Sequence, residues 1–287
     1  MYSGFTSPFN YDQALHKPPM NLEFYRPTLE ALSPYIEGYY FISPSEHSDN
    51  LHYWTFPNNY FIVSVSQGVS IEMEKHRLLV RPSAQQTVLS NFVSRYTTPI
   101  EVLCYGPILE ITIYFKPLGI NQFIENPYLL FKQNTALDFN PFSDFNPAMA
   151  DILSTSDRSL QRKKLEAYWF SKLQIREFRP LKEILFALES EEKIEDIAHR
   201  HGFSRQYLSK LFSKVVGKSP VEYRKIHRFR AAIATQKHMK SLTELSHESL
   251  FYDQSHLIKD FKQFTSVSPL TFFKKVDTDQ ECLWLYI

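Results

Sequence analysis

The chain has 287 residues, of which 43% are hydrophobic and 22% charged, and its formal net charge is +1. This length favours two domains, and the composition is ordinary for a globular protein that buries proper cores. No run of about 18 apolar residues occurs, and residues 1–20 lack the basic start and apolar core of a secretory signal, so we expect neither a membrane helix nor a signal peptide. Cys104 and Cys282 lie far apart without metal-ligand spacing. We therefore expect free thiols and a cytoplasmic protein.

The charge is unevenly distributed along the chain. Residues 180–275 carry 17 Lys and Arg against 11 Asp and Glu, a net charge of +6, whereas residues 1–179 carry a net charge of −2. A basic segment joined to a mildly acidic one indicates that one part of the chain meets a polyanion.

Residues 20–135 are predicted to be rich in β-structure. Short runs of β-branched and aromatic residues, separated by turn signals, cover residues 60–69, 71–80, 100–103 and 109–115. Alternation in the last run gives two faces, which are Ile111, Ile113 and Phe115 against Glu110, Thr112 and Tyr114. Several short strands of this kind favour a small sandwich or barrel.

A helical connection follows the β-rich segment. A polar, proline-containing stretch at residues 140–148 precedes a predicted helix over residues 160–175, which Asp157 or Ser159 would cap. Its apolar stripe consists of Leu160, Leu165, Trp169 and Leu173. Two interpretations stay open, since such a helix could pack on the β-rich domain or form a dimer contact.

Residues 193–215 have the pattern of a helix-turn-helix. Gly202 supplies the positive φ that a tight turn between helices requires, and Ser204 is a good N-cap for the second helix. Ala198 is small where the two helices would cross. The apolar faces of the two helices consist of Ile194, Ile197, Leu208, Leu211 and Phe212.

The same pattern returns in residues 242–264. Three pairs share an offset of 49 residues, and they are Leu208 with Leu257, Phe212 with Phe261, and Ser219-Pro220 with Ser268-Pro269. Phe203 and Phe251 differ by 48 residues, which predicts one extra residue in the second turn. Internal duplication is a strong signal, and a single long helix over residues 221–239 is expected to join the two units.

Short motifs identify the kind of domain. They are Ile197-Ala198, Gly202-Phe203-Ser204, LSKLF at 208–212, Gly217-Lys218-Ser219-Pro220, Tyr223-Arg224, residues 251–256 and Val267-Ser268-Pro269. With these motifs, the segment 180–275 resembles the DNA-binding domain of the AraC/XylS family of transcription regulators. The resemblance implies a seven-helix domain that places two recognition helices in successive major-groove faces. It also implies double-stranded DNA, RNA polymerase and a second copy of the chain as partners.

Three positions of the second unit depart from the family pattern. Ser246 stands at the small alanine, Leu250 at the turn glycine, and Ser266 at the glycine before Val267. A leucine at positive φ would be strained by roughly 1–2 kcal/mol. Either the longer turn takes another shape or the second unit is less stable. We expect the second unit to contribute phosphate contacts rather than sharp base readout.

A recognition helix reads bases through exposed residues of its N-terminal half. The base-reading candidates face away from the apolar stripes, and they are Arg205, Gln206, Ser209, Lys210, Gln254, Ser255 and Lys259. Gln206 can bond adenine at two points, and Lys210 can reach guanine or a phosphate. The phosphate candidates, whose contribution would be sensitive to salt, are Lys214, Lys218, Arg224, Lys262 and Lys274.

A β-rich domain fused to such a DNA-binding domain implies, in this family, the sensing of a small-molecule effector; control by abundance is the alternative. The aromatic candidates for a pocket are Tyr40, Trp54, Tyr60, Tyr105 and Tyr114. A pocket of this kind would take a small, sugar-like or apolar ligand. Ordinary core packing is the alternative explanation for the same residues.

The sequence offers no pattern for catalysis. Its ten histidines show no cupin-like metal spacing, and no Ser-His-Asp, P-loop or GxGxxG pattern occurs, so we expect no metal, no cofactor and no enzyme. A cupin-like sugar enzyme with a degenerate helical appendage is the hypothesis from another class, and it would need a metal triad or a carboxylate pair in the barrel. A regulator that lost DNA affinity and acts through protein contacts is a third, motivated by Leu250 and Ser266.

The predicted fold is α+β in two domains. A β-rich, cupin-like barrel or sandwich spans residues 1–140, and a helical linker with a possible role in dimerisation spans 141–179. An all-α DNA-binding domain with two helix-turn-helix units spans 180–275, and residues 276–287 form a tail.

Overall fold

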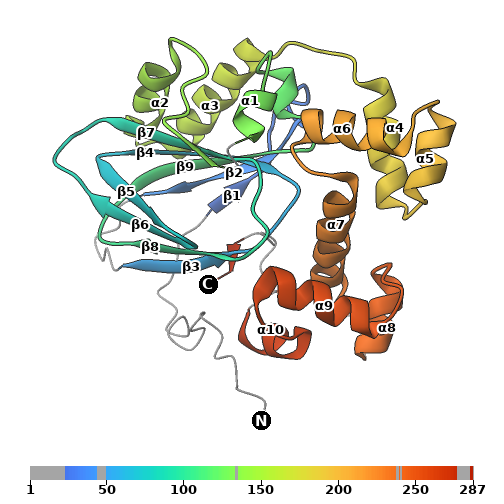
Figure 1. Ribbon diagram of the computed structural model, residues 1–287. Coiled ribbons are helices and arrows are strands. Elements are labelled where there is room, and N and C mark those ends of the chain that lie inside the picture. The colour runs from blue at the N-terminus through green and yellow to red at the C-terminus, as the bar shows by residue number, and fades with distance from the viewer. Residues whose placement is uncertain are drawn as a thin grey trace.

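Two β-sheets pack face to face in the N-terminal domain (Figure 1). The computed structural model describes residues 23–43, 50–132, 135–236, 239, 241–276 and 285–286. The strands are β1 (Glu23–Tyr25), β2 (Ile36–Ile42), β3 (Leu51–Thr55), β4 (Phe61–Gln67), β5 (Val69–Glu74), β6 (Arg77–Pro82), β7 (Val88–Val93), β8 (Ile100–Cys104), β9 (Leu109–Phe115), β10 (Thr135–Leu137) and β11 (Leu285–Tyr286). One sheet has the order β1-β2-β9-β4-β7-β10 and the other β11-β3-β8-β6-β5. Neighbouring strands are antiparallel except β6 and β8. The predicted β-rich domain is therefore confirmed, as a sandwich rather than a closed barrel.

Strand β9 has the two faces that its alternating sequence predicts. Ile111, Ile113 and Phe115 pack into the core beneath the helices. Glu110 and Thr112 point the other way and lie between the two sheets. Both faces are buried, because helices cover one side of the six-stranded sheet and the second sheet covers the other.

Three helices cover the outer face of the six-stranded sheet (Figure 1). They are α1 (Tyr128–Phe131), α2 (Phe145–Ser154) and α3 (Arg158–Lys172). Trp169 of α3 is buried with its ring centroid 4.9 Å from that of Phe115, and Asp157 caps the helix by accepting a bond of 2.6 Å from the amide of Leu160. Packing on the β domain is thus the arrangement seen for α3. Leu160, predicted to share the stripe, is exposed instead, because five residues along a helix turn it about 140° from Leu165.

Seven helices form the C-terminal domain within the described residues up to Val276. They are α4 (Arg179–Glu189), α5 (Ile194–Arg200), α6 (Arg205–Val216), α7 (Pro220–Thr235), α8 (Leu242–Glu248), α9 (Gln254–Thr265) and α10 (Pro269–Lys275). Helix α7 is the predicted long connection, although it ends at Thr235 and not at residue 239, and it runs between the pair α5–α6 and the pair α8–α9 (Figure 1). Tyr223, near its start, is buried in the core of the first pair, whereas Phe229, a turn and a half later, is buried in that of the second. One rigid helix therefore fixes the spacing of both units.

The β domain contributes a side chain to the core of each helix-turn-helix unit. Leu118, in the loop after β9, packs into the core of the first unit. Phe56, which follows β3, is fully buried in the core of the second, with its ring centroid 5.1 Å from that of Phe272. The core of each helix-turn-helix unit therefore includes a residue of the β domain.

Polar contacts reinforce these two insertions. The guanidinium of Arg230 on α7 donates to the carbonyl oxygens of Phe56 and Pro57, the latter over 2.8 Å. The amide of Asn59 donates to the carbonyl oxygen of Tyr223 over 3.0 Å. Because these bonds hold backbone carbonyls in place, they fix the orientation of the two domains.

The end of the chain returns to the β domain. Strand β11 pairs antiparallel with β3, with Leu285 opposite Thr55, so the predicted tail contributes an edge strand. Cys104 is a free, buried thiol, whereas Cys282 lies outside the described residues. Among the helices described, none combines the length and apolar character needed to span a bilayer.

Candidate nucleic-acid interface and β-domain cavity

The first helix-turn-helix unit consists of α5, a four-residue turn and α6. Gly202 adopts φ +67° in the turn, and the amide of Phe203 donates to the carbonyl oxygen of Ala198 over 2.8 Å. The hydroxyl of Ser204 accepts a bond of 3.1 Å from the amide of Tyr207, which satisfies one of the free donors at the start of α6. The turn and the cap together set the direction in which α6 leaves the unit.

Helix α6 presents a polar surface at its N-terminal half. Arg205, Gln206 and Lys210 are exposed, and Ser209 is half-buried. Arg205 forms an exposed ion pair of 2.8 Å with Glu195 of α5, a contact that DNA would have to break or share. Tyr207, next to Gln206, is exposed as well. It was not among the predicted base-reading residues, because its ring was assigned to neither the polar nor the apolar face of the helix.

The second unit repeats this geometry with different residues. Leu250 adopts φ +63°, which is the conformation of Gly202, so the turn keeps its shape despite the leucine. The carboxylate of Asp253 caps α9 by accepting a bond of 2.8 Å from the amide of His256, and this bond lowers the pKa of Asp253. Tyr252 is the extra residue of the turn and projects into solvent.

The polar surface of α9 is exposed at its start. The candidate base-reading residues Gln254, Ser255 and Lys259 all reach solvent. Ser246, which replaces the small alanine, is fully buried, and its hydroxyl donates to the carbonyl oxygen of Thr243 over 2.8 Å. The serine therefore satisfies its polar group inside its own helix and does not separate α8 from α9.

Two of the predicted phosphate contacts need correction, and Lys218 is the clearer one. Its side chain is 2% exposed, its ammonium donates to the carbonyl oxygen of Ser94 over 2.6 Å, and it lies 5.3 Å from the ring centroid of Phe61. Burial lowers the pKa of Lys218 to about 8. Lys218 joins the two domains and cannot reach a phosphate in this structure. Local sequence gave no sign of this, because the contact is made by distant strands.

Arg224 is the second correction. It lies 3.6 Å from the carboxylate of Glu191 and also donates to the carbonyl oxygen of Glu192. Arg228 binds the same carboxylate over 3.2 Å and reaches Asp260 of α9 over 3.6 Å. These ion pairs connect both units through α7, so Arg224 has a structural partner. The other phosphate candidates, which are exposed, are Lys214, Lys262 and Lys274.

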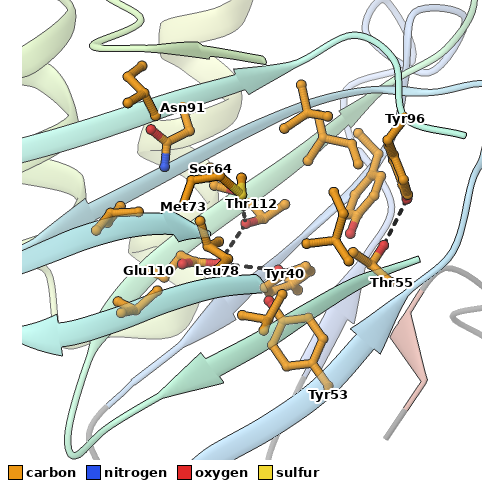
Figure 2. A pocket seen from close by; sticks show the side chains of 18 residues that line it. Tyr40, Tyr53, Thr55, Ser64, Met73, Leu78, Asn91, Tyr96, Glu110 and Thr112 are labelled. Atoms are coloured by element: carbon orange, nitrogen blue, oxygen red, sulfur yellow. Dashed lines mark hydrogen bonds between the residues drawn. The ribbon is translucent and has the colours of Figure 1, made fainter. Parts of the chain in front are cut away.

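A second candidate site lies between the two sheets of the β domain (Figure 2). The cavity has a volume of about 70 Å³. Its polar lining residues are Tyr40, Tyr53, Thr55, Ser64, Asn91, Tyr96, Glu110 and Thr112, and the remainder of the wall is mostly aliphatic. A mostly aliphatic wall with a few converging polar groups is typical of a ligand site, and the volume of this one suits only a small molecule.

Glu110 is the one acidic residue in that wall. Its carboxylate accepts bonds from Tyr40 over 3.2 Å, Ser66 over 3.1 Å and Thr112 over 2.9 Å. All three donors are neutral, and burial raises the pKa of Glu110. The site therefore favours a ligand that donates a hydrogen bond over one that carries a negative charge.

The predicted aromatic candidates divide between this cavity and other places. Tyr40 and Tyr114 line it. Trp54 instead packs with the second helix-turn-helix core, and Tyr60 packs edge-on against Tyr114 outside the wall. Tyr105 lies at the surface beneath Arg81, so these three residues do not line this cavity. Strand alternation could have favoured Glu110 but could not show that a second sheet encloses it.

Tyr96 connects the cavity with the C-terminal helical domain. Its hydroxyl donates to the carbonyl oxygen of Phe56 over 2.6 Å and contacts the hydroxyl of Thr55 over 2.8 Å. Phe56 is the side chain buried in the second helix-turn-helix core. A molecule that moved Tyr96 would thus move a residue packed under α9.

Within the described residues no cluster of metal-ligating side chains occurs.

Comparisons with known proteins give one family match, over the helix-turn-helix region, and several similar solved structures. Residues 202–275 match a family model described as a helix-turn-helix domain. No curated protein sequence matches the chain. Among solved structures it is similar to ToxT from Vibrio cholerae, with 14% identity, a TM-score of 0.43, and coverage of 83% of this chain and 97% of that one. It is also similar to unsaturated fatty acid bound ToxT from Vibrio cholerae strain SCE256, with 17% identity, a TM-score of 0.43, and coverage of 82% and 92%.

Proposed function

We propose that this chain, which carries an AraC-type helix-turn-helix domain over residues 202–275, is a transcription regulator that binds specific sites on double-stranded DNA. The observation that carries the proposal is the pair of capped helices α6 and α9, held by one helix and each exposing polar residues at its start. Such helices enter successive major grooves on one face of a duplex. A role in regulation without catalysis and a cytoplasmic location follow from this activity.

The first unit is proposed to supply the sharper base readout. Gln206 can make two bonds to an adenine, and Lys210 can bind guanine. Lys214, Lys262 and Lys274 would hold the phosphate backbone, so affinity should fall steeply as salt rises. In the second unit, Ser255 and Lys259 occupy the positions of Gln206 and Lys210, and a serine makes fewer base contacts than a glutamine.

Footprinting on genomic fragments followed by binding titrations tests this proposal. The double variant Gln206→Ala, Lys210→Ala is expected to lose about 10- to 100-fold in affinity for the preferred site and much less for random DNA. The matched control is Ser255→Ala, Lys259→Ala, which should weaken both DNAs by similar factors. Absence of saturable, salt-dependent binding by the wild type would sink the proposed function.

The β domain is proposed to control the regulator through the cavity at Glu110. The contacts that support this are those of Tyr96 with Thr55 and the carbonyl of Phe56, which lead from the cavity wall to the core of the second unit. A small, hydrogen-bond-donating molecule in the cavity should change DNA affinity, and titrations in the presence of candidate metabolites measure this. Tyr96→Phe should uncouple ligand binding from DNA affinity, whereas an unchanged response would exclude this route.

We also propose that the chain acts as a homodimer that contacts RNA polymerase. Leu160 and Phe170 are exposed on the side of α3 that faces away from the sheet, and they offer an apolar face to a second copy. Sedimentation of Leu160→Glu, Phe170→Glu against the wild type tests the dimer. A wild type that stays monomeric at micromolar concentration and on DNA would exclude it.

A further inference from the structure

A groove with a volume of about 700 Å³ separates the recognition helix α6 from helix α1 of the β domain. Gly217, at the end of α6, lies at its base, where a Cβ atom would come within 3.2 Å of Phe131 and 3.3 Å of Phe61. Glycine thus lets α6 approach the β domain closely at this end. The two walls of the groove belong to different domains but are held at a fixed distance.

The groove is lined by cations from both domains. Arg95 and Lys132 come from the β domain, and Lys210 and Lys214 come from α6. The ammonium groups of Lys132 and Lys214 lie 5.7 and 5.4 Å from the ring centroid of Tyr128, so one ring holds a cation from each wall. No acidic residue is among the lining residues described.

One of the four cations has an acidic partner outside the lining. Arg95 forms an ion pair of 2.7 Å with Glu222, but 42% of its side chain stays exposed, and a guanidinium has donors to spare for a second anion. Lys132, Lys210 and Lys214 are exposed, and none of them forms an ion pair with an acidic side chain in the described part of the chain. The groove therefore attracts an anion more strongly than the net charge of +1 indicates.

The position of the groove indicates which anion it meets. Ser209 and Lys210 belong both to the groove and to the proposed base-reading surface of α6. A duplex seated on α6 must carry one of its phosphate strands past this edge, and B-DNA presents about one charge per 1.7 Å of axis. An open trough between two basic walls suits a continuous strand of phosphates better than a small enclosed ligand.

We propose that the β domain binds DNA directly, with Lys132 and Arg95 contacting phosphates of the duplex that α6 reads. The inference rests on the proposed function and extends it, because the β domain becomes part of the DNA-binding surface. Its contacts carry no sequence information and set affinity and register. Any shift of the β domain relative to α6 would then change DNA affinity at the interface itself.

DNA titrations of the full chain at several salt concentrations test this inference. Lys132→Ala is expected to lower affinity about three- to tenfold for preferred and random DNA alike, and to reduce the slope of log K against log salt by about 0.9. Lys132→Glu should have the larger effect. The matched control is Lys163→Ala, which removes an exposed lysine of α3 outside the groove. Thermal unfolding shows whether each variant is folded.

The outcomes separate this inference from the proposed function. If the wild type binds DNA and the Gln206→Ala, Lys210→Ala variant loses its site, but both Lys132 variants behave like Lys163→Ala, the β domain makes no DNA contact and the inference is overturned. Tighter binding by Lys132→Glu would overturn it too, because a carboxylate placed beside phosphates would repel them and weaken binding. A wild type that binds no DNA overturns both proposals together.

Discussion

The two helix-turn-helix units have the same backbone conformation at their turns but adopt it with different residues. Gly202 and Gly217 of the first unit have φ values of +67° and +74°, and Leu250 and Ser266 of the second have +63° and +62°. Glycine adopts this conformation freely, whereas other residues pay roughly 1–2 kcal/mol. The second unit keeps the costly conformation because Phe251, next to Leu250, is buried in the core and its amide is bonded to Ser246 over 2.9 Å. Packing thus decides the turn where local preference opposes it.

The units also differ in what the β domain gives them. The first receives Leu118 and the carbonyl oxygen of Ser94, which accepts a bond from the unit's own buried Lys218, and the second receives the aromatic side chain of Phe56. Val267 occupies in the second unit the position that Lys218 has in the first. The first unit is therefore held to the β domain partly by a polar contact that depends on protonation, and the second chiefly by apolar burial and the Arg230 bonds.

The largest effect is expected for Phe56→Ala. Removing a fully buried phenylalanine should lower the free energy of unfolding by about 3–5 kcal/mol, and it should loosen the second unit before the first. Denaturant unfolding measures the total, and amide exchange in α9 against α6 measures the difference. Tyr252→Ala is the control, because that ring is exposed in the same unit. An equal loss of amide protection in α6 and α9 would contradict the expected difference between the two units.

Lys218→Val gives the first unit the residue of the second and should change the dependence of stability on pH. Because the pKa of Lys218 falls to about 8 from an ordinary 10.5, the unfolded chain holds one more proton between these values. The free energy of unfolding of the wild type should therefore rise by about 3 kcal/mol relative to the variant from pH 8 to pH 10.5. Denaturant titrations at four pH values measure it. Parallel curves for the two proteins would show that Lys218 is not desolvated.

The smallest effect is expected at the turns. Leu250→Gly should relieve the positive φ and stabilise the protein by about 1 kcal/mol, since the leucine is 45% exposed and has only part of its packing to lose. Gly202→Leu is the reciprocal change, and it should destabilise by a similar amount, because open space surrounds the position where a Cβ would lie. Thermal unfolding compares the two. A loss of stability in Leu250→Gly would mean that the leucine contributes contacts that outweigh its strain.

Much of the DNA-binding domain could be predicted from sequence. The 49-residue repeat, the cap Ser204 and the extra residue in the second turn are local signals, because caps and turns are settled within a few residues of the chain. Alternation predicted the two faces of β9 for the same reason. The family model matches residues 202–275 within this domain. For the β domain, the sequence predicted only the fold class.

Sequence by itself determined that helices come as two matched units joined by a long helix, and which residues of each unit share a face. Only the tertiary structure decided which polar residues stay in water. Lys218 and Arg224 are buried or paired, Glu110 is enclosed by a second sheet, and Phe56 completes a core about 200 residues further along the chain. Local propensity acts over a few residues, whereas desolvation and packing depend on whatever distant segment arrives alongside, and no pattern within one segment records it.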